Sequence, residues 1–212
     1  MMKSEEIMSA LDNLYPDARC ELNYTKDYEL LIATVLSAQC TDKRVNEVTK
    51  VLFSKYDLAS LKQADVKDIE AIIRPCGSYT KKAQYIKIIA TKLIDDYKGK
   101  VPNNREYLES LPGVGRKTCN VVLSNIYDVP AIAVDTHVAR VSKRLGLAKE
   151  NDDVSVIEQK LMKKFPKDKW SRLHHQLVLF GRYHCTARNP QCRECLLKDK
   201  CNYRKKLLVH HE

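Results

Sequence analysis

Apolar positions recur along most of this chain at the three-to-four-residue spacing of amphipathic α-helices. In the first half, helices are predicted to begin near Ser4, Asp27, Thr41, Asp65 and Thr80, whose residue types are common at helix N-termini. The stretch YELLIATVLSAQ, which follows Asp27, is apolar around most of its circumference, as in a helix buried on several sides. Neither Asn-Gly nor Asp-Gly occurs, so the strongest hairpin signals of antiparallel sheet are absent. The pattern predicts an all-α protein.

The second half continues the helical pattern with clear stop and start signals. Gly99 and Gly146 each follow a periodic segment, as C-terminal helix stops do. Pro130 interrupts an apolar run, and Asp135 then lies where an N-cap would lie. No repeat, low-complexity run or Gly/Ser-rich linker separates the segments, which favours two closely packed helical domains in these 212 residues. The predicted helices of this half cover residues 105–111, 116–127, 136–145, 154–165 and 170–183.

The charge of the chain points to a polyanionic partner. Lys and Arg number 37 against 27 Asp and Glu, which gives a formal net charge of +10. Such an excess favours nucleic acid first and an anionic membrane surface second, while a merely soluble basic protein remains the alternative. No secretory signal pattern and no window of ~20 apolar residues is present, so we expect an intracellular protein that does not span a membrane.

Four of the eight cysteines crowd into residues 185–201 with the spacing C-x6-C-x2-C-x5-C. Four thiolates at such short separations can surround a tetrahedral zinc ion or an iron-sulfur cluster, and cysteine chemistry alone does not decide between the two. The other four lie among apolar residues, where a free cysteine usually behaves as a small buried hydrophobe. The clustered cysteines are Cys185, Cys192, Cys195 and Cys201, and the scattered ones are Cys20, Cys40, Cys76 and Cys119.

Two of only six glycines lie in one short stretch, LPGVGRKTCN. A helix ending at Leu111, a turn through Gly113 and Gly115, and a helix starting near Arg116 would form a helix-hairpin-helix unit. Glycine permits positive φ and leaves backbone N–H groups uncovered, so a phosphate oxygen can approach them and the positive end of the second helix. The alternative is an ordinary corner between two helices. Arg116 and the net charge favour phosphate binding.

Lys117 follows Arg116 and is the only lysine in the stretch LPGVGRKTCN. A lysine becomes a nucleophile where desolvation or neighbouring positive charge favours its neutral amine, and both Arg116 and the helix N-terminus act in that direction. The alternative is a simple phosphate contact or a solvated charge. Asp135 is interpreted in the same way: helix capping explains it locally, and capping does not exclude a role in catalysis.

The stretch LPGVGRKT, followed by VDTH twenty residues after Gly115, resembles the helix-hairpin-helix and aspartate signature of the base-excision DNA glycosylase superfamily. Together with the cysteine spacing, it is similar to the endonuclease III family. The resemblance extends over nearly the whole chain and includes ELNY, ELLIATVLSAQCTD, LFGRYHC and AR. It implies a helical barrel domain of residues 21–130 and a second domain of residues 1–20 and 131–212, with a DNA cleft between them.

The resemblance implies the chemistry as well. Lys117 would attack the sugar and Asp135 would assist loss of the base, so that one enzyme removes oxidised pyrimidines and then cleaves the abasic site by β-elimination. Gln39 would enter the gap left by the flipped nucleotide, and His137 would lie near the phosphate or the cleft. The second inserting residue of the family is a bulky aliphatic after a glycine, and Ser78 departs from that pattern.

The resemblance also assigns the four clustered cysteines to a [4Fe-4S] cluster and the partner to double-stranded DNA that contains a damaged base or an abasic site. We expect a cytoplasmic monomer, since one cleft of this kind needs only one chain. Rival activities on the same scaffold are an adenine glycosylase, which lacks the lysine, and a lyase restricted to photoproducts or abasic sites. Rivals of other classes are a noncatalytic DNA-binding module and a ferredoxin-like electron carrier.

Overall fold

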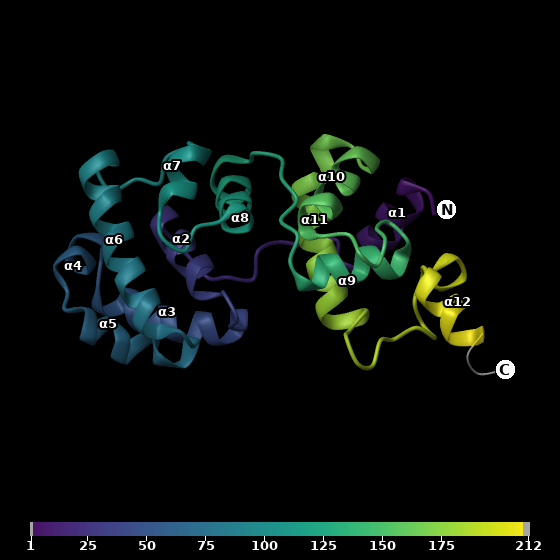
Figure 1. Cartoon of the computed structure of the whole chain (residues 1–212), viewed down its shortest axis with the longest axis horizontal. Helices are drawn as coiled ribbons and strands as arrows, with labels where there is room; N and C mark the ends of the chain where they lie inside the picture. Colours follow the sequence, from purple (N-terminus) through teal and green to yellow (C-terminus); the bar gives the residue numbers. More distant parts are fainter. Residues whose placement is uncertain (1, 210–212) are drawn as a thin grey trace. The chain divides into compact units, whose positions relative to one another are not determined.

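The computed structural model describes residues 2–209 and is helical throughout, without a strand among the residues it describes (Figure 1). The all-α prediction is therefore confirmed. The backbone divides into two compact units. The first unit combines Met1–Cys20 with Asp128–Glu212, and the second unit is the continuous segment Glu21–Tyr127.

The second unit is built around the apolar helix α2, Asp27–Leu36, whose residues from Tyr28 onward are all buried. This helix packs against α3, α6 and α8, which explains why its sequence is apolar on nearly every side. The shorter helices α4 and α5 pack against α6. The remaining bounds are α3 Asp42–Lys55, α4 Leu58–Gln63, α5 Val66–Ile73, a 3-10 turn Arg74–Cys76, α6 Tyr79–Tyr97, α7 Arg105–Ser110 and α8 Arg116–Tyr127.

The first unit brings the N-terminal helix together with the C-terminal third of the chain, as the purple and green helices of Figure 1 show. Helix α11 packs against α1 and α9, and α12 also packs against α9. The core of this unit includes the fully buried Leu11, Val141 and Phe180. Its elements are α1 Ser4–Leu14, α9 Thr136–Leu145, α10 Val154–Lys164, α11 Trp170–Leu179, a π-helical segment Phe180–His184 and α12 Asn202–Val209.

Several helix boundaries follow the capping signals in the sequence. The side chains of Thr41, Asp65 and Asp135 accept hydrogen bonds from backbone N–H groups of α3, α5 and α9. Gly146 ends α9 with a left-handed φ of 76°, and Gly99 follows α6 with a φ of 83°. These five predicted caps and stops are confirmed.

Three predicted N-caps are displaced: α6 has Ser78 as its N-cap in place of Thr80, and the other two are displaced by one residue. Ser4 and Asp27 are the first helical residues of α1 and α2, and the N-caps are Lys3 and Lys26. In α2 the reason is Glu29, whose side chain accepts a hydrogen bond from the Lys26 backbone N–H at 3.1 Å. The Glu29 carboxylate, at the third helical position, thus accepts a backbone N–H at the N-terminus of α2 that has no partner within the helix.

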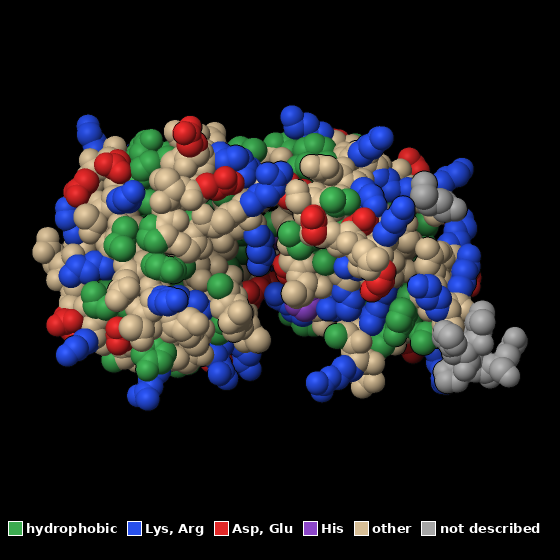
Figure 2. Space-filling view, in the orientation of Figure 1, with side chains coloured by type: hydrophobic (Ala, Val, Ile, Leu, Met, Phe, Trp, Pro, Cys, Tyr) green, Lys and Arg blue, Asp and Glu red, His purple; other side chains and the backbone are tan. Residues whose placement is uncertain are grey.

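The helices α4 and α12 were not among the predicted segments, although they are as long as α7 and α5, which were predicted. No helix in residues 2–209 combines the length and the apolar character that a membrane span would need. Lys and Arg side chains are spread over both units on the face drawn in Figure 2, as the net charge leads one to expect.

Candidate active site

The hairpin of the second unit joins α7 to α8 through the turn from Leu111 to Gly115. Asn104 caps α7 by accepting the Tyr107 N–H at 3.0 Å. Arg105 crosses to α8, where its guanidinium donates to Asn120 Oδ1 at 2.7 Å. The carbonyl of Gly115 accepts the Cys119 N–H at 2.9 Å, which is the first hydrogen bond of α8. The two helices are therefore held in a fixed geometry, with the N-terminus of α8 at the tip of the turn.

The two glycines of the turn meet different requirements. Gly113 has a φ of 76°, and a Cβ added there would lie 2.8 Å from Tyr85 Cδ2 and 3.1 Å from Val35 Cγ1. The fold itself therefore requires glycine at this position. A Cβ added to Gly115 would have no heavy atom within 4 Å. Since no neighbour requires glycine at Gly115, the open approach to its backbone fits a ligand rather than the fold.

Arg116 and Lys117 are exposed and form the first turn of α8. The N–H groups of a first helical turn lack intrahelical partners, so together with these two side chains they present positive charge at the tip of the hairpin. The structure thus brings together four of the residues singled out in the sequence, namely Gly113, Gly115, Arg116 and Lys117.

In the first unit, Asp135 and His137 lie at the N-terminus of α9. One oxygen of Asp135, Oδ1, accepts the backbone N–H groups of His137 at 2.9 Å and Val138 at 2.8 Å. These bonds fix the orientation of the carboxylate at the N-terminus of α9. The Asp135 residue is half-buried.

The ring of His137 is held between its own helix and the π-helical segment. The Nδ1 atom of His137 lies 3.2 Å from Nη2 of Arg140. Nη2 of Arg140 also donates to the Gly181 carbonyl at 2.6 Å. A Cβ added to Gly181 would lie 2.9 Å from His137 Cβ and 3.1 Å from Val141 Cγ2. Glycine at this position therefore allows the two segments to approach closely, and it sets where His137 lies.

Gln39 lies in the turn between α2 and α3, because α2 ends at Leu36 and not at Gln39 as its apolar pattern suggested. Its backbone has a left-handed φ of 57°, which is unusual for a residue other than glycine, and its side chain is exposed. The structure therefore presents Gln39 at a loop tip and not on a helix face.

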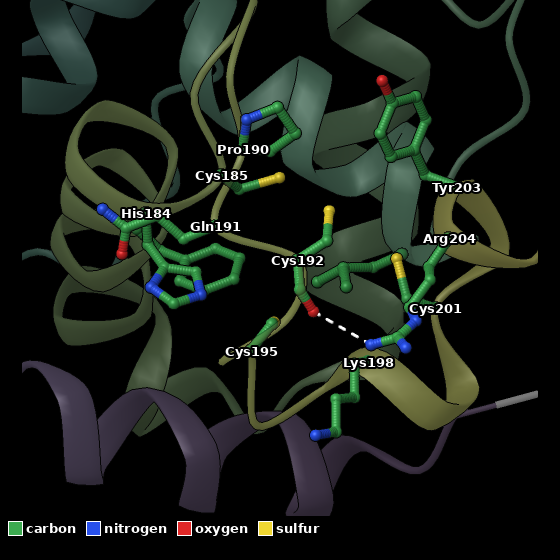
Figure 3. A pocket seen from close by; sticks show the side chains of 12 residues that line it. His184, Cys185, Pro190, Gln191, Cys192, Cys195, Lys198, Cys201, Tyr203 and Arg204 are labelled. Atoms are coloured by element: carbon green, nitrogen blue, oxygen red, sulfur yellow. Dashed lines mark hydrogen bonds between the residues drawn. The ribbon is translucent and has the colours of Figure 1, made fainter. Parts of the chain in front are cut away.

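The four clustered cysteines line one pocket of the first unit. Figure 3 shows Cys185, Cys192 and Cys201 around this space, with His184 on one side and Arg204 on the other. The thiols surround the pocket and do not converge on one point, since no group of three His, Cys, Asp or Glu in residues 2–209 is arranged to hold a single metal ion.

Arginines, which the sequence analysis did not single out, hold the cysteine segment in place. From α9, Arg140 Nε donates to the Cys185 carbonyl at 3.2 Å, and Arg144 donates to the carbonyls of Thr186 at 2.7 Å and Ala187 at 3.0 Å. Arg144 also donates to Cys185 Sγ at 3.4 Å. The helical spacing of His137, Arg140 and Arg144 was the available signal, because it places all three on one face of α9.

The chemistry of the pocket fits a cationic centre. Burial raises the pKa of the Cys195 thiol, and negative charge on the other three cysteines would raise it further. Burial likewise raises the pKa of Cys192. The positive charges of Arg144 and Arg204 oppose this effect at Cys192, and a metal or cluster bound among the thiolates would stabilise them further. The donor set and its surroundings therefore fit an iron-sulfur cluster.

The predicted site residues thus fall into four groups. The hairpin residues and Gln39 lie in the second unit, whereas Asp135 with His137 and the four cysteines lie in the first unit. Ser78 is in the second unit and, like Gln39, is exposed at a left-handed φ, here 47°.

Sequence comparison assigns the chain to a known group of proteins. Residues 32–167 match the model of the HhH-GPD superfamily base excision DNA repair proteins. The endonuclease III of Bacillus subtilis strain 168 is 48% identical over 205 residues, which cover 95% of this chain and 94% of the relative. The endonuclease III of Escherichia coli K12 is 41% identical over 206 residues, which cover 97% of each chain.

Solved structures agree with the sequence matches. A trapped covalent intermediate of an endonuclease III with DNA, in an estranged-adenine complex, superposes with a TM-score of 0.92 at 49% identity and covers 98% of this chain and 100% of the other. A non-covalent endonuclease III-DNA complex superposes with a TM-score of 0.93 at 49% identity and covers 99% of this chain and 100% of the other.

Proposed function

The chain belongs to the endonuclease III family of the HhH-GPD superfamily of base excision DNA repair proteins, and we propose that it removes oxidised pyrimidines from double-stranded DNA. The family makes it a DNA glycosylase and abasic-site lyase. The substrate is a duplex with a damaged base or an abasic site, and one chain with one DNA-binding surface suffices, so we expect a monomer. The site of action is the cytoplasm, where the DNA of the cell is accessible to it.

The nucleophile of the proposed reaction is the amine of Lys117. The observation that carries this assignment is the position of Lys117 on an exposed first turn of α8, beside Arg116 and two residues after the open backbone of Gly115. A similar endonuclease III has been trapped as a covalent intermediate with DNA, which supports an amine that bonds to the sugar.

The proposed reaction removes the damaged base and then cleaves the DNA strand on the 3′ side of the sugar. As the bond between C1′ and the damaged base breaks, the Lys117 nitrogen bonds to C1′, and the base leaves with the electron pair and takes up the proton that the nitrogen loses. The sugar ring then opens at its C1′–O4′ bond as O4′ takes up a proton, which gives a protonated Schiff base between Lys117 and C1′. Loss of a C2′ proton expels the 3′ phosphate, and water finally releases the amine. Lys117 thus serves both the glycosylase and the lyase steps.

Asp135 stabilises the positive charge that develops on the deoxyribose and helps to activate the amine. The two backbone bonds to its Oδ1 hold the carboxylate still, so that it does not reorganise when the charge develops. His137, held by Arg140 and the segment at Gly181, contacts the DNA near the same nucleotide.

Binding of the substrate involves the hairpin and Gln39. Backbone N–H groups at Gly113 and Gly115, together with Arg116, bind a phosphate next to the flipped nucleotide. A base inside a duplex is out of reach of Lys117, so the nucleotide must leave the stack and another group must fill its place. Gln39 is exposed at a loop tip and supplies that group.

The cysteine pocket would hold a [4Fe-4S] cluster through Cys185, Cys192, Cys195 and Cys201, which line it. When bound, the cluster would tie together the segment that carries the exposed Arg188 and Arg193, whose charges would then be available to the phosphate backbone. Lys198 supports this segment by donating to the Arg193 carbonyl at 3.2 Å. Arg144 and Arg204 support the segment from the protein side, since Arg204 donates to the Cys192 carbonyl at 3.0 Å (Figure 3).

Borohydride trapping tests the nucleophile directly. The protein is incubated with a duplex that contains one thymine glycol or one abasic site and is then reduced, and a covalent adduct is expected. Lys117→Ala should give no adduct. Lys117→Arg is the matched variant, because it keeps the positive charge for phosphate binding but cannot form a Schiff base. An adduct that persists in both variants would assign the amine elsewhere, and no adduct with the parent protein would favour a noncatalytic or monofunctional activity.

The cluster is tested by composition. Purified protein should contain four iron and four sulfide per chain and absorb broadly in visible light. Serine at any of the four pocket cysteines should lower both contents, whereas Cys20→Ser, outside the pocket, should not. One zinc ion per chain and no sulfide would replace the cluster with a structural zinc site.

A further inference from the structure

Lys82 is a lysine of α6 whose side chain is 5% exposed. Its ammonium makes three hydrogen bonds, all to backbone carbonyls: Leu36 at 2.9 Å, Ala38 at 2.8 Å and Cys76 at 2.8 Å. Three N–H donors thus meet three acceptors, which is the full capacity of the group. Because burial of an ammonium is unfavourable, and here also lowers the pKa of Lys82, a buried lysine at this position requires an explanation.

The three acceptors belong to two loops that are distant in the sequence. Leu36 and Ala38 lie at the end of α2 and directly before Gln39. Cys76 ends the 3-10 turn that leads through Gly77 to Ser78. Because a single nitrogen bonds to Ala38 and to Cys76, the two loops are joined through Lys82. The amine therefore links the two loops, next to a hydrogen-bond contact between the Cys40 and Cys76 side chains.

Each loop tip carries an exposed residue in a strained backbone conformation. Gln39 has a φ of 57° and Ser78 a φ of 47°, although neither is a glycine. Left-handed conformations of such residues persist only where the surrounding structure imposes them, and they cluster at functional sites. The carbonyls that Lys82 holds belong to the residue before Gln39 and to the second residue before Ser78. Lys82 is thus placed to impose both conformations.

We propose that Lys82 is a positioning residue that holds the tips at Gln39 and Ser78 as one rigid two-pronged element, which enters the DNA where the damaged nucleotide leaves the stack. Lys82 itself stays buried and does not touch the substrate. The short side chain of Ser78 is compatible with this role, because the element is stiffened by the buried amine and not by the bulk of its tip. This inference rests on the proposed insertion of Gln39.

The test compares Lys82→Met with Lys87→Met. Lys87 is the matched control, because it also projects from α6 and donates to a single backbone carbonyl, that of Ala64, at 2.8 Å. Single-turnover excision of thymine glycol from a duplex should slow about tenfold or more in Lys82→Met and by less than about twofold in Lys87→Met. With a duplex that pairs an abasic-site analogue with 2-aminopurine, the fluorescence increase on binding should shrink in Lys82→Met only.

A double variant separates positioning from general damage to the fold. If Lys82 acts through Gln39, then adding Lys82→Met to Gln39→Ala should slow excision by less than about twofold further. If the double variant instead loses excision rate by the product of the two single-variant losses, the inference is overturned. Lys82→Gln, which retains two N–H donors, should recover part of the rate that Lys82→Met loses. Equal rates in these two variants would also contradict the role of the hydrogen bonds.

The remaining outcomes distinguish this inference from the proposed function. If Gln39→Ala is slow and Lys82→Met is as fast as the parent, only the role of Lys82 is wrong. If Gln39→Ala is as fast as the parent, then insertion by Gln39 is wrong, and the proposed role of Lys82 is wrong as well. The trapping result at Lys117 does not depend on either. Should the Lys82 variants fail to fold, hydrogen exchange on the parent decides: residues 37–40 and 76–79 should gain protection together on DNA, and independent protection would refute the joint element.

Discussion

The hairpin glycines, substituted one at a time, separate what the fold needs from what DNA binding needs. Gly113→Ala would place a methyl group 2.8 Å from the Tyr85 ring and 3.1 Å from Val35, at a φ of 76°. Gly115→Ala would place the same methyl group in open space. The first substitution should therefore reduce stability, and the second should leave stability unchanged and reduce the affinity for DNA.

The expected magnitudes follow from these contacts. A left-handed conformation costs about 1 to 2 kcal/mol for a residue with a Cβ, and overpacking adds about 1 to 3 kcal/mol, so Gly113→Ala should lose about 3 kcal/mol of unfolding free energy. In a chain of this size, that loss lowers Tm by about 6 to 12 °C. Gly115→Ala should change the unfolding free energy by less than about 0.5 kcal/mol. A lost hydrogen bond to a phosphate is worth about 1.5 to 3 kcal/mol, which weakens DNA binding by about tenfold to a hundredfold.

The assays are urea unfolding followed by circular dichroism, and fluorescence anisotropy with a duplex that carries an abasic-site analogue at one fixed salt concentration. The slope of affinity against salt should stay unchanged in Gly115→Ala, since no cation is removed, whereas Arg116→Ala should lower the slope by about 1. DNA binding of Gly115→Ala at the parental affinity would refute phosphate binding by the hairpin backbone. Parental stability of Gly113→Ala would refute the steric argument for that turn.

Three further predictions concern the first unit. Asp135→Asn, which can still cap α9, should keep the unfolding free energy within about 0.5 kcal/mol of the parent, while the rate of excision falls at least about a hundredfold. Asp135→Ala should lose the same activity and also about 1 kcal/mol of stability. Excision by Asp135→Asn at the parental rate would show that Asp135 is only a helix cap. Gly181→Ala should lower Tm because of the 2.9 Å contact with His137 Cβ, and an unchanged Tm would show that the two segments can separate freely. Burial lowers the pKa of His175 to about 4, so the unfolded chain, with a histidine pKa of about 6.5, binds the proton first as the pH falls. This group's contribution to stability is complete above about pH 6.5 and is lost towards pH 4, by about 2 kcal/mol at pH 5. Urea titrations at pH 7 and pH 5 should show a stability difference that is smaller by about 2 kcal/mol in His175→Gln. Burial also lowers the pKa of His184, so part of the pH dependence should remain in that variant.

Much of the local structure was readable from the sequence because its causes are local. The caps at Thr41, Asp65 and Asp135 depend on hydrogen bonds to residues two or three positions away. The hairpin and the cysteine segment are likewise encoded within about ten to twenty consecutive residues, and glycine and cysteine carry distinctive chemistry.

The sequence by itself also determined the residue types available for chemistry, namely an amine after the hairpin turn, a carboxylate at a helix start and four close cysteines. Only the tertiary structure decided which distant groups meet. Nothing near Lys82 in the sequence indicates that its ammonium bonds to Leu36 and Ala38, more than forty residues away, and nothing near Arg144 indicates its bonds to Thr186 and Ala187. Such contacts depend on how helices pack, and packing is set by the shape of the whole core and not by any local pattern.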